Sequence, residues 1–223
     1  MPASEEFKIN FDYLYRNEGV RKNVYLPGSD TFAFIEALKD EVESFTQDIN
    51  VALEMGSGSG YLILSMYELL LNRNIKIGVL YCVDINKDAC SCVRNIASEN
   101  KIANVEIINA DLFNNIRKCG QFDLIIFNPP YVATEQGEMN RTDIVASYAG
   151  GEHGREVILK FLLSVYDYVS DNGVIYILLE KNNMPHETMN SEQITNKFHC
   201  TQIKEKQTLN ETIFIYKLSK KLQ

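Results

Sequence analysis

The sequence lacks the features that mark membrane, secreted or disulfide-linked proteins. It has no run of about 18 apolar residues, the length that a membrane-spanning helix requires. Residues 1–10 are polar and carry acids, unlike the basic start and apolar core of a signal peptide. The five cysteines are odd in number and include no CxxC pair, which favours reduced, mostly buried thiols over a metal or redox site. We expect no bound metal and a cytoplasmic protein that could also enter the nucleus.

The sequence also has fewer basic than acidic residues. The chain has 22 Lys and Arg against 30 Asp and Glu, a net charge of −8. Because an acidic chain repels phosphate backbones, and no basic stripe is evident, the composition disfavours nucleic acid as a main partner. The 223 residues are 45% apolar with no low-complexity tract, which predicts one α/β domain over residues 1–223.

Apolar strands alternate with helices from about residue 30 to about residue 180. We predict strands over residues 49–54, 77–83, 105–108, 122–127 and 173–179, and helices over residues 61–71, 87–100 and 155–169. A further helix, capped by Ser29 or Asp30, carries apolar residues at helical spacing to Val42. Strands that are apolar throughout indicate a parallel sheet covered on both faces. Residues 198–206 and 212–218 flank a short polar turn, which predicts a closing antiparallel hairpin.

A glycine-rich turn follows the first strand. Gly56, Gly58 and Gly60 are spaced GxGxG, not the GxGxxG of dinucleotide binders. Glu54, two residues before the first glycine, suits a ligand with a cationic amino group better than one with phosphates. A plain strand-to-helix turn explains the glycines equally well when they are taken alone.

Acidic residues end the next two strands. Asp84 can accept hydrogen bonds from both hydroxyls of a ribose, or cap the helix that begins near Lys87; the nearby glycine turn favours the ribose. Asp111 can bond the exocyclic amine of adenine while Leu112 presents an apolar surface to the ring. An Asx-turn at Asp111 is an equal alternative.

The most informative segment is Asn128-Pro129-Pro130-Tyr131, which ends the fourth strand. Two prolines remove two backbone donors and stiffen the chain. The Asn128 side-chain oxygen and a free carbonyl match the two donors of one NH2 group, and Tyr131 adds a flat aromatic surface. All these segments end parallel strands, where open α/β sheets bind their ligands, and this convergence is stronger evidence than any one of them.

The spacing of these segments resembles a known family. Glu54-x-Gly56-x-Gly58-x-Gly60 resembles motif I of class I methyltransferases, and Asn128-Pro129-Pro130-Tyr131 resembles motif IV of amino methyltransferases. Residues 24–32, 148–151 and 154–156 are similar to the eukaryotic and archaeal branch of HemK-like protein glutamine methyltransferases. Gly28 departs from the usual small residue of that branch, and residues 134–143 are less similar.

The resemblance implies a Rossmann-like fold that binds S-adenosyl-L-methionine, with a seven-stranded, mostly parallel sheet, a C-terminal antiparallel hairpin, and residues 1–30 packed over the cofactor site. It implies methyl transfer to the glutamine of the Gly-Gly-Gln motif in class I translation termination (release) factors, as a heterodimer with a small zinc-binding activator. The implied cofactor-binding residues are Tyr25, Thr31, Glu54, Gly56, Gly58, Asp84, Ile85, Asp111, Leu112 and Asn128. The implied substrate-binding residues are Asn128, Pro129, Pro130 and Tyr131, of which Asn128, Pro129 and Tyr131 are catalytic.

Asn128 and the Pro129 carbonyl are expected to accept both hydrogens of the target amide and aim its nitrogen at the methyl group. No histidine is needed, and we expect His153, His186 and His199 to be surface or structural residues.

Three alternatives stay open. A protein lysine, histone lysine included, could enter the same slot beside Tyr131. DNA or RNA adenine also presents a planar NH2 group, although the net charge argues against it. A binding protein without activity would keep the cofactor site alone, whereas the glycine spacing weakens an NAD-dependent dehydrogenase.

The third strand is expected at a sheet edge. It begins with Val105, ends with Ile108 and is apolar, so its unpaired backbone groups would invite strand addition by the activator protein.

Overall fold

One sheet of seven strands forms the centre of the molecule. The computed structural model describes residues 8–135, 137–139, 141–208 and 211–221. The strand order is β3-β2-β1-β4-β5-β7-β6. The strands are β1 (Ile49–Met55), β2 (Ile77–Asp84), β3 (Val105–Asn109), β4 (Phe122–Phe127), β5 (Val169–Glu180), β6 (Phe198–Gln207) and β7 (Thr212–Lys220). The first five are parallel, and β7 pairs antiparallel with both β5 and β6. The predicted sheet and closing hairpin are confirmed.

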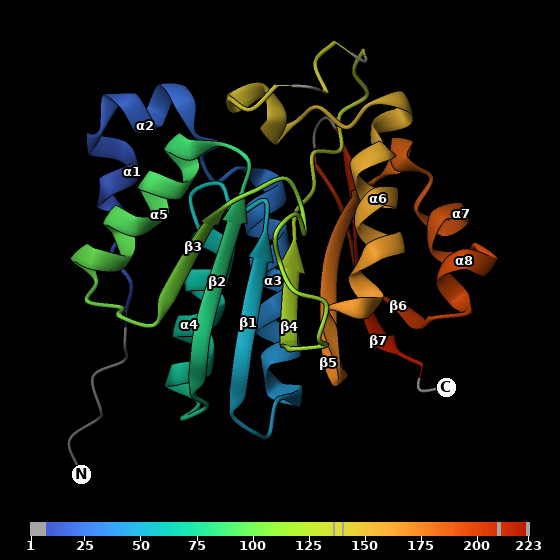
Figure 1. Cartoon of the computed structure of the whole chain (residues 1–223), viewed down its shortest axis with the longest axis horizontal. Helices are drawn as coiled ribbons and strands as arrows, with labels where there is room; N and C mark the ends of the chain where they lie inside the picture. Colours follow the sequence, from blue (N-terminus) through green and yellow to red (C-terminus); the bar gives the residue numbers. More distant parts are fainter. Residues whose placement is uncertain (1–7, 136, 140, 209–210, 222–223) are drawn as a thin grey trace.

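Helices cover both faces of this sheet, because its strands are apolar on both sides. One core joins the sheet to α1 (Asp12–Arg16), α2 (Glu18–Asn23), α3 (Ser29–Glu41), α4 (Tyr61–Asn72) and α5 (Lys87–Glu99). The other joins it to α6 (Glu156–Ser164), α7 (Pro185–Asn190) and α8 (Glu192–Thr195). In Figure 1, α3 and α4 lie behind the sheet and α6 lies in front of it, while the arrowheads of β1 to β4 point to the same edge. Among the described residues, no helix combines the length and apolar content needed to cross a bilayer.

The start of α3 differs from the prediction. Neither Ser29 nor Asp30 caps the helix, because Ser29 is already its first helical residue. Gly28 has the extended backbone of an N-cap (φ −115°, ψ −167°), and its N–H donates to Thr31 Oγ1 at 3.3 Å. The Asp30 carboxylate is therefore free for other contacts.

Two boundaries near β5 were also predicted wrongly. The helix that begins after Arg155 ends at Ser164, and a 3-10 turn, Val165–Asp167, follows it. Strand β5 starts at Val169, which pairs with Phe122 across a register shift. The polar residues before Gly173 resemble a turn in sequence, but they belong to this irregular start of the strand.

Candidate active site

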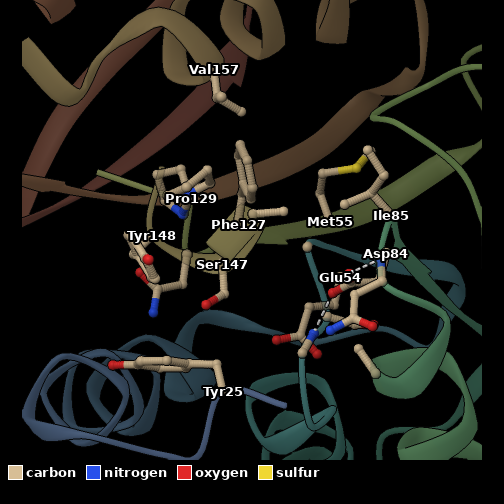
Figure 2. A pocket seen from close by; sticks show the side chains of 18 of the residues that line it. Tyr25, Glu54, Met55, Asp84, Ile85, Phe127, Pro129, Ser147, Tyr148 and Val157 are labelled. Carbon is tan, nitrogen blue, oxygen red and sulfur yellow. Dashed lines mark hydrogen bonds between the residues drawn. The ribbon is translucent and has the colours of Figure 1, made fainter. Parts of the chain in front are cut away.

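A cavity of about 220 Å³ opens at the carboxyl ends of the parallel strands. Every site residue that the sequence analysis named lines it: Tyr25, Thr31, Glu54, Gly56, Gly58, Asp84, Ile85, Asp111, Leu112, Asn128, Pro129, Pro130 and Tyr131. In Figure 2, Glu54 and Asp84 lie at one end of the cavity, Pro129 and Tyr148 lie at the other, and Tyr25 borders it from the N-terminal segment. The fold thus brings together residues that are up to about a hundred positions apart in the chain.

The glycine turn between β1 and α4 requires glycine. Gly56, Gly58 and Gly60 have φ values of 59°, 51° and 74°, a region that side chains other than glycine rarely adopt. A Cβ on Gly60 would come within 3.0 Å of Val93 on α5. Between these glycines, the Ser57 hydroxyl oxygen is buried and has no hydrogen-bond partner. The turn therefore places an unsatisfied polar group at the cavity wall.

Two carboxylates at this end of the sheet have no cationic partner. Glu54 is 3% exposed and accepts one hydrogen bond, from the Ile63 N–H at 3.2 Å. Burial raises the pKa of Glu54 well above its ordinary value, and the nearby Asp84 carboxylate raises it further. Neither acid forms an ion pair with a Lys or Arg of the described residues. Buried negative charge without a counterion favours a cationic ligand.

Asp84 does not cap α5, so that alternative is wrong. The cap is Asn86, whose Oδ1 accepts from the Asp88 N–H at 2.9 Å. Asp84 instead accepts from the Gly58 N–H at 2.7 Å and from the Asn86 N–H at 2.8 Å. Burial raises the pKa of Asp84, and these backbone bonds oppose the rise. The carboxylate is therefore fixed against the glycine turn and borders the cavity.

Asp111 and Leu112 lie beside each other on the cavity wall. The Asp111 side chain is exposed, and it makes no Asx-turn hydrogen bond with the described residues; the Asn114 N–H bonds the Asp111 backbone carbonyl instead, at 3.0 Å. Leu112 has a φ of 47°. The Asp111 carboxylate thus remains available to a ligand.

Asn128 holds the group that decides the chemistry of the cavity. Its Nδ2 donates to Asp30 Oδ2 at 2.7 Å. Its Oδ1 is buried and has no partner. A buried acceptor left without a hydrogen bond costs about 1–3 kcal/mol, so a ligand N–H that reached this oxygen would be stabilising.

Tyr131 is held at both ends. Its hydroxyl donates to Glu211 Oε2 at 3.1 Å, and its backbone carbonyl accepts from Asn183 Nδ2 at 2.9 Å. Burial, followed by the charges of Asp30 and Glu211, raises the pKa of the Tyr131 hydroxyl, which therefore stays protonated at neutral pH.

Sequence reasoning missed Asn183, which supports the turn from behind. Its side chain is fully buried, and its Nδ2 also donates to the carbonyls of His153 and Gly154. A Cβ on Gly154 would lie 1.9 Å from the Tyr131 carbonyl oxygen, so only glycine fits there. No local pattern marks Asn183, because its three acceptors come from distant segments.

The structure also places the remaining residues that line the cavity, the histidines and the cysteines. Glu211 and the cavity-lining residues Met139, Arg141 and Ser147 had no sequence signal, and Tyr148 was noted only as part of a segment similar to the HemK-like branch. The three histidines are exposed and do not line the cavity, as predicted: His153, His186 and His199. Of the cysteines, Cys82, Cys90 and Cys92 are buried, Cys200 is half-buried and Cys119 is exposed.

Known proteins are similar to this chain in both sequence and fold. Residues 29–208 match the family model of the methyltransferase small domain. The chain is 31% identical over 220 residues to methyltransferase HEMK2 of Homo sapiens, which covers 98% of this chain and 99% of that one. It is 30% identical over 167 residues to a putative protein N5-glutamine methyltransferase of Methanocaldococcus jannaschii, which covers 75% and 77% of the two chains.

A solved structure agrees with this relationship. It is that of the E. cuniculi Mtq2–Trm112 complex, described as responsible for methylation of the eRF1 translation termination factor. The match has a TM-score of 0.65 and 26% identity, and it covers 89% of this chain and 99% of that one. The family model and the HEMK2 match each span most of the sequence, so this chain belongs to the methyltransferase small domain family and, within it, to the HemK-like methyltransferases.

Proposed function

We propose that this methyltransferase uses S-adenosyl-L-methionine to methylate the side-chain amide nitrogen of the glutamine in the Gly-Gly-Gln motif of a translation termination factor. The observation that carries the proposal is the unpartnered Asn128 Oδ1, at the wall of a cavity that also contains uncompensated carboxylates. The names of similar proteins support it, since eRF1 methyltransferase mtq2 of Schizosaccharomyces pombe and a release factor glutamine methyltransferase of Lactococcus lactis are among them.

The cavity suits this cofactor. S-adenosylmethionine supplies an electrophilic methyl group on a positively charged sulfur and carries an ammonium group and a ribose. Glu54 offers a buried negative charge to the cationic part. Asp84 can accept from ribose hydroxyls, and Asp111 from the adenine amine. Tyr25, Thr31, Gly56, Gly58, Ile85 and Leu112 complete the wall.

The target amide is held by acceptors, not activated by a base. An amide nitrogen is a poor nucleophile because its lone pair is delocalised into the carbonyl. Asn128 Oδ1 and the Pro129 carbonyl accept its two hydrogens, which orients the nitrogen and offsets the positive charge that grows on it. The nitrogen–methyl bond would form as the methyl–sulfur bond breaks, S-adenosylhomocysteine would leave, and the methylated amide would then lose one of its hydrogens to solvent as a proton. Alignment and preorganised dipoles each contribute several kcal/mol, roughly 3–4 for one well-placed group.

Tandem mass spectrometry of a termination factor tests this activity. We expect one added methyl group on the glutamine of the Gly-Gly-Gln motif after incubation with enzyme, activator protein and S-adenosylmethionine. A termination factor with that glutamine changed to alanine is the matched control and should stay unmodified. Histone protein and DNA, assayed in parallel, test lysine and adenine; methylation of either one without modification of the glutamine would overturn the proposal.

The described part of the N-terminal extension, residues 8–30, supports a covering role over the cofactor site. Tyr25 and Pro27 line the cavity. The Asn23 carbonyl accepts from Asn86 Nδ2 at 2.8 Å, beside Asp84. Leu14 and Val20 are buried in the same core as α4 and α5, so the extension belongs with the single domain that we propose for residues 1–223.

A small zinc-binding activator protein is the proposed partner, added as a strand along β3. β3 is an edge of the sheet, as predicted, and among the described strands it pairs with β2 alone. The Asn104 carbonyl and the Ala110 N–H both form hydrogen bonds with β2. The backbone N–H and C=O groups of even-numbered residues in this segment therefore point to β2, and those of odd-numbered residues point away from the sheet. The Mtq2 neighbour was solved as a complex with a second protein, Trm112.

Proline scanning of β3 tests the pairing. Ile107→Pro removes an outward N–H and keeps the β2 ladder, so co-purification with the activator should be lost. Ile107→Ala makes a comparable loss of packing but keeps the N–H, and should still co-purify. Equal capture of both variants would contradict pairing at β3.

A further inference from the structure

Asp30 is a buried acid that neither an ion pair nor a helix cap explains. Its exposed fraction is 2%, and it forms no ion pair with a described Lys or Arg. It does not cap α3, because Gly28 does. Three donors nevertheless point at it: the Tyr25 hydroxyl at 2.7 Å, the Thr31 hydroxyl at 3.3 Å and Asn128 Nδ2 at 2.7 Å. These three donors offset the cost of burying the carboxylate, and the carboxylate in turn fixes the orientation of each donor.

The Asn128 amide can be turned in two ways, and only one exposes an acceptor to the substrate. A carboxylate accepts hydrogen bonds and cannot donate them. Beside Asp30, the Asn128 NH2 group must therefore face Oδ2, and the Asn128 oxygen must face away from it. That oxygen is the one left without a partner. The orientation is set by chemistry, not by packing, since the two ends of an amide are nearly equal in size.

We propose that Asp30 is the positioning residue of the methyl-transfer site, which fixes the Asn128 amide with its oxygen toward the target nitrogen and polarises that oxygen. The inference rests on the proposed function. The charge-assisted bond from Asn128 Nδ2 draws electron density toward Oδ1. A more negative Oδ1 is a better acceptor for an N–H group whose nitrogen gains positive charge as the methyl group is transferred.

Tyr25 occupies the other oxygen of this carboxylate. Burial and the neighbouring Asp30 raise the pKa of the Tyr25 hydroxyl, so it remains a donor. Asp30 Oδ1 accepts from the Tyr25 hydroxyl, and Asp30 Oδ2 accepts from Asn128 Nδ2. An asparagine at position 30 would have one oxygen for these two donors, so Asn128 could bond that oxygen only if the Tyr25 hydroxyl stopped donating to it.

This competition makes the role of Asp30 testable by a double-mutant cycle. Asp30→Asn should lower kcat by about 100-fold, with little change in KM or in cofactor affinity measured by calorimetry. Tyr25→Phe added to Asp30→Asn removes the competing donor, so the amide at 30 can turn its oxygen to Asn128 and its NH2 group to the Thr31 hydroxyl. We expect the double variant to regain about tenfold in kcat over Asp30→Asn, a coupling that independent losses would not give.

The matched control is Asp40→Asn, the same change on the same helix. Asp40 is largely exposed and lies 3.8 Å from Lys204, outside the cavity. It should keep wild-type kcat. Wild-type kcat in Asp30→Asn, or additive losses in the double variant, would overturn the inference while the proposed function stands. Wild-type enzyme without activity on the Gly-Gly-Gln protein would instead refute the proposed function.

A measurement on the unaltered protein covers the case in which Asp30→Asn does not fold. The side-chain NH2 signals of Asn128 can be assigned in a nitrogen-15 NMR spectrum by their loss in Asn128→Asp. One proton shifted downfield and protected from exchange supports its bond to Asp30. Two unshifted, rapidly exchanging protons would overturn the inference.

Discussion

Polar groups at the two ends of the parallel strands differ in whether they have hydrogen-bond partners. At the amino ends, Asp123 accepts from the Asn50 and Val51 N–H groups at 2.9 and 3.3 Å and from the Ser170 hydroxyl at 2.8 Å. At the carboxyl ends, Asn128 Oδ1 and Ser57 Oγ have no partners. The polar groups of Asp123 join strands to each other, whereas two buried polar atoms at the carboxyl ends are left for a ligand.

The acids show the same contrast. Asp48 at the amino ends accepts from the Lys76 N–H at 2.8 Å, and Lys118 pairs with Asp167 at 3.0 Å. Glu54 at the carboxyl ends lacks a cation and has a raised pKa. A protein accepts unsatisfied groups where function requires them, so substitutions at the two ends should divide into effects on activity and effects on stability.

The largest expected effect is at the carboxyl ends. Asn128→Ala removes the acceptor that aligns the target nitrogen, and it should lower kcat by at least about 100-fold, the scale for one preorganised group. Cofactor binding by calorimetry should persist. Asn95→Ala, on the exposed face of α5, is the control and should retain full activity. Wild-type turnover by Asn128→Ala would refute the mechanism.

The opposite behaviour is expected at the amino ends. Asp123→Ala leaves two backbone N–H groups and one hydroxyl without their acceptor, which should lower the free energy of unfolding by about 1–3 kcal/mol. Denaturant unfolding measures this loss. The kcat of the folded fraction should stay at the wild-type value, because Asp123 is far along the strands from the cavity lining. A large fall in kcat would contradict the claim that substitutions at the amino ends affect stability and not activity.

Glu54→Gln is expected to have a smaller effect, and to raise the stability of the folded protein instead of lowering it. The raised pKa means that the folded protein holds a proton more tightly than the unfolded chain, so stability from Glu54 is present below its ordinary pKa of 4.5 and is lost as pH rises through the folded pKa. Above the folded pKa, Glu54 carries a buried charge that glutamine lacks, and the substitution keeps an acceptor for the Ile63 N–H. The ligand-free variant should therefore melt higher, by about 2–4 °C for each kcal/mol gained. A lower Tm would contradict the charge argument.

Much of this arrangement could be predicted from sequence where the information is local. Strand β4 has the predicted limits, and β1 and β2 differ by one residue, because uninterrupted apolar runs define buried strands. The glycine turn and the Asn128 turn were placed correctly, since parallel strands deliver their carboxyl ends to one edge.

The parts that could not be predicted depend on tertiary contacts or on short elements. Asp30 is 98 positions from Asn128, and at the start of α3 it matched the pattern of a helix cap. Asn183 joins three carbonyls from two loops and carries no motif. Helices α1, α2, α7 and α8 have four to six residues, too few turns for a periodic pattern.

Calorimetric titration of S-adenosylmethionine into the wild-type protein, Glu54→Gln and Asp123→Asn, all with the activator bound, tests the contrast between the two ends most directly. We predict saturable binding to the wild type, weaker binding to Glu54→Gln because its buried negative charge is gone, and wild-type affinity in Asp123→Asn. Equal affinities for the wild type and Glu54→Gln, or no binding to the wild type, would contradict a carboxyl-end site built for a cationic nucleoside.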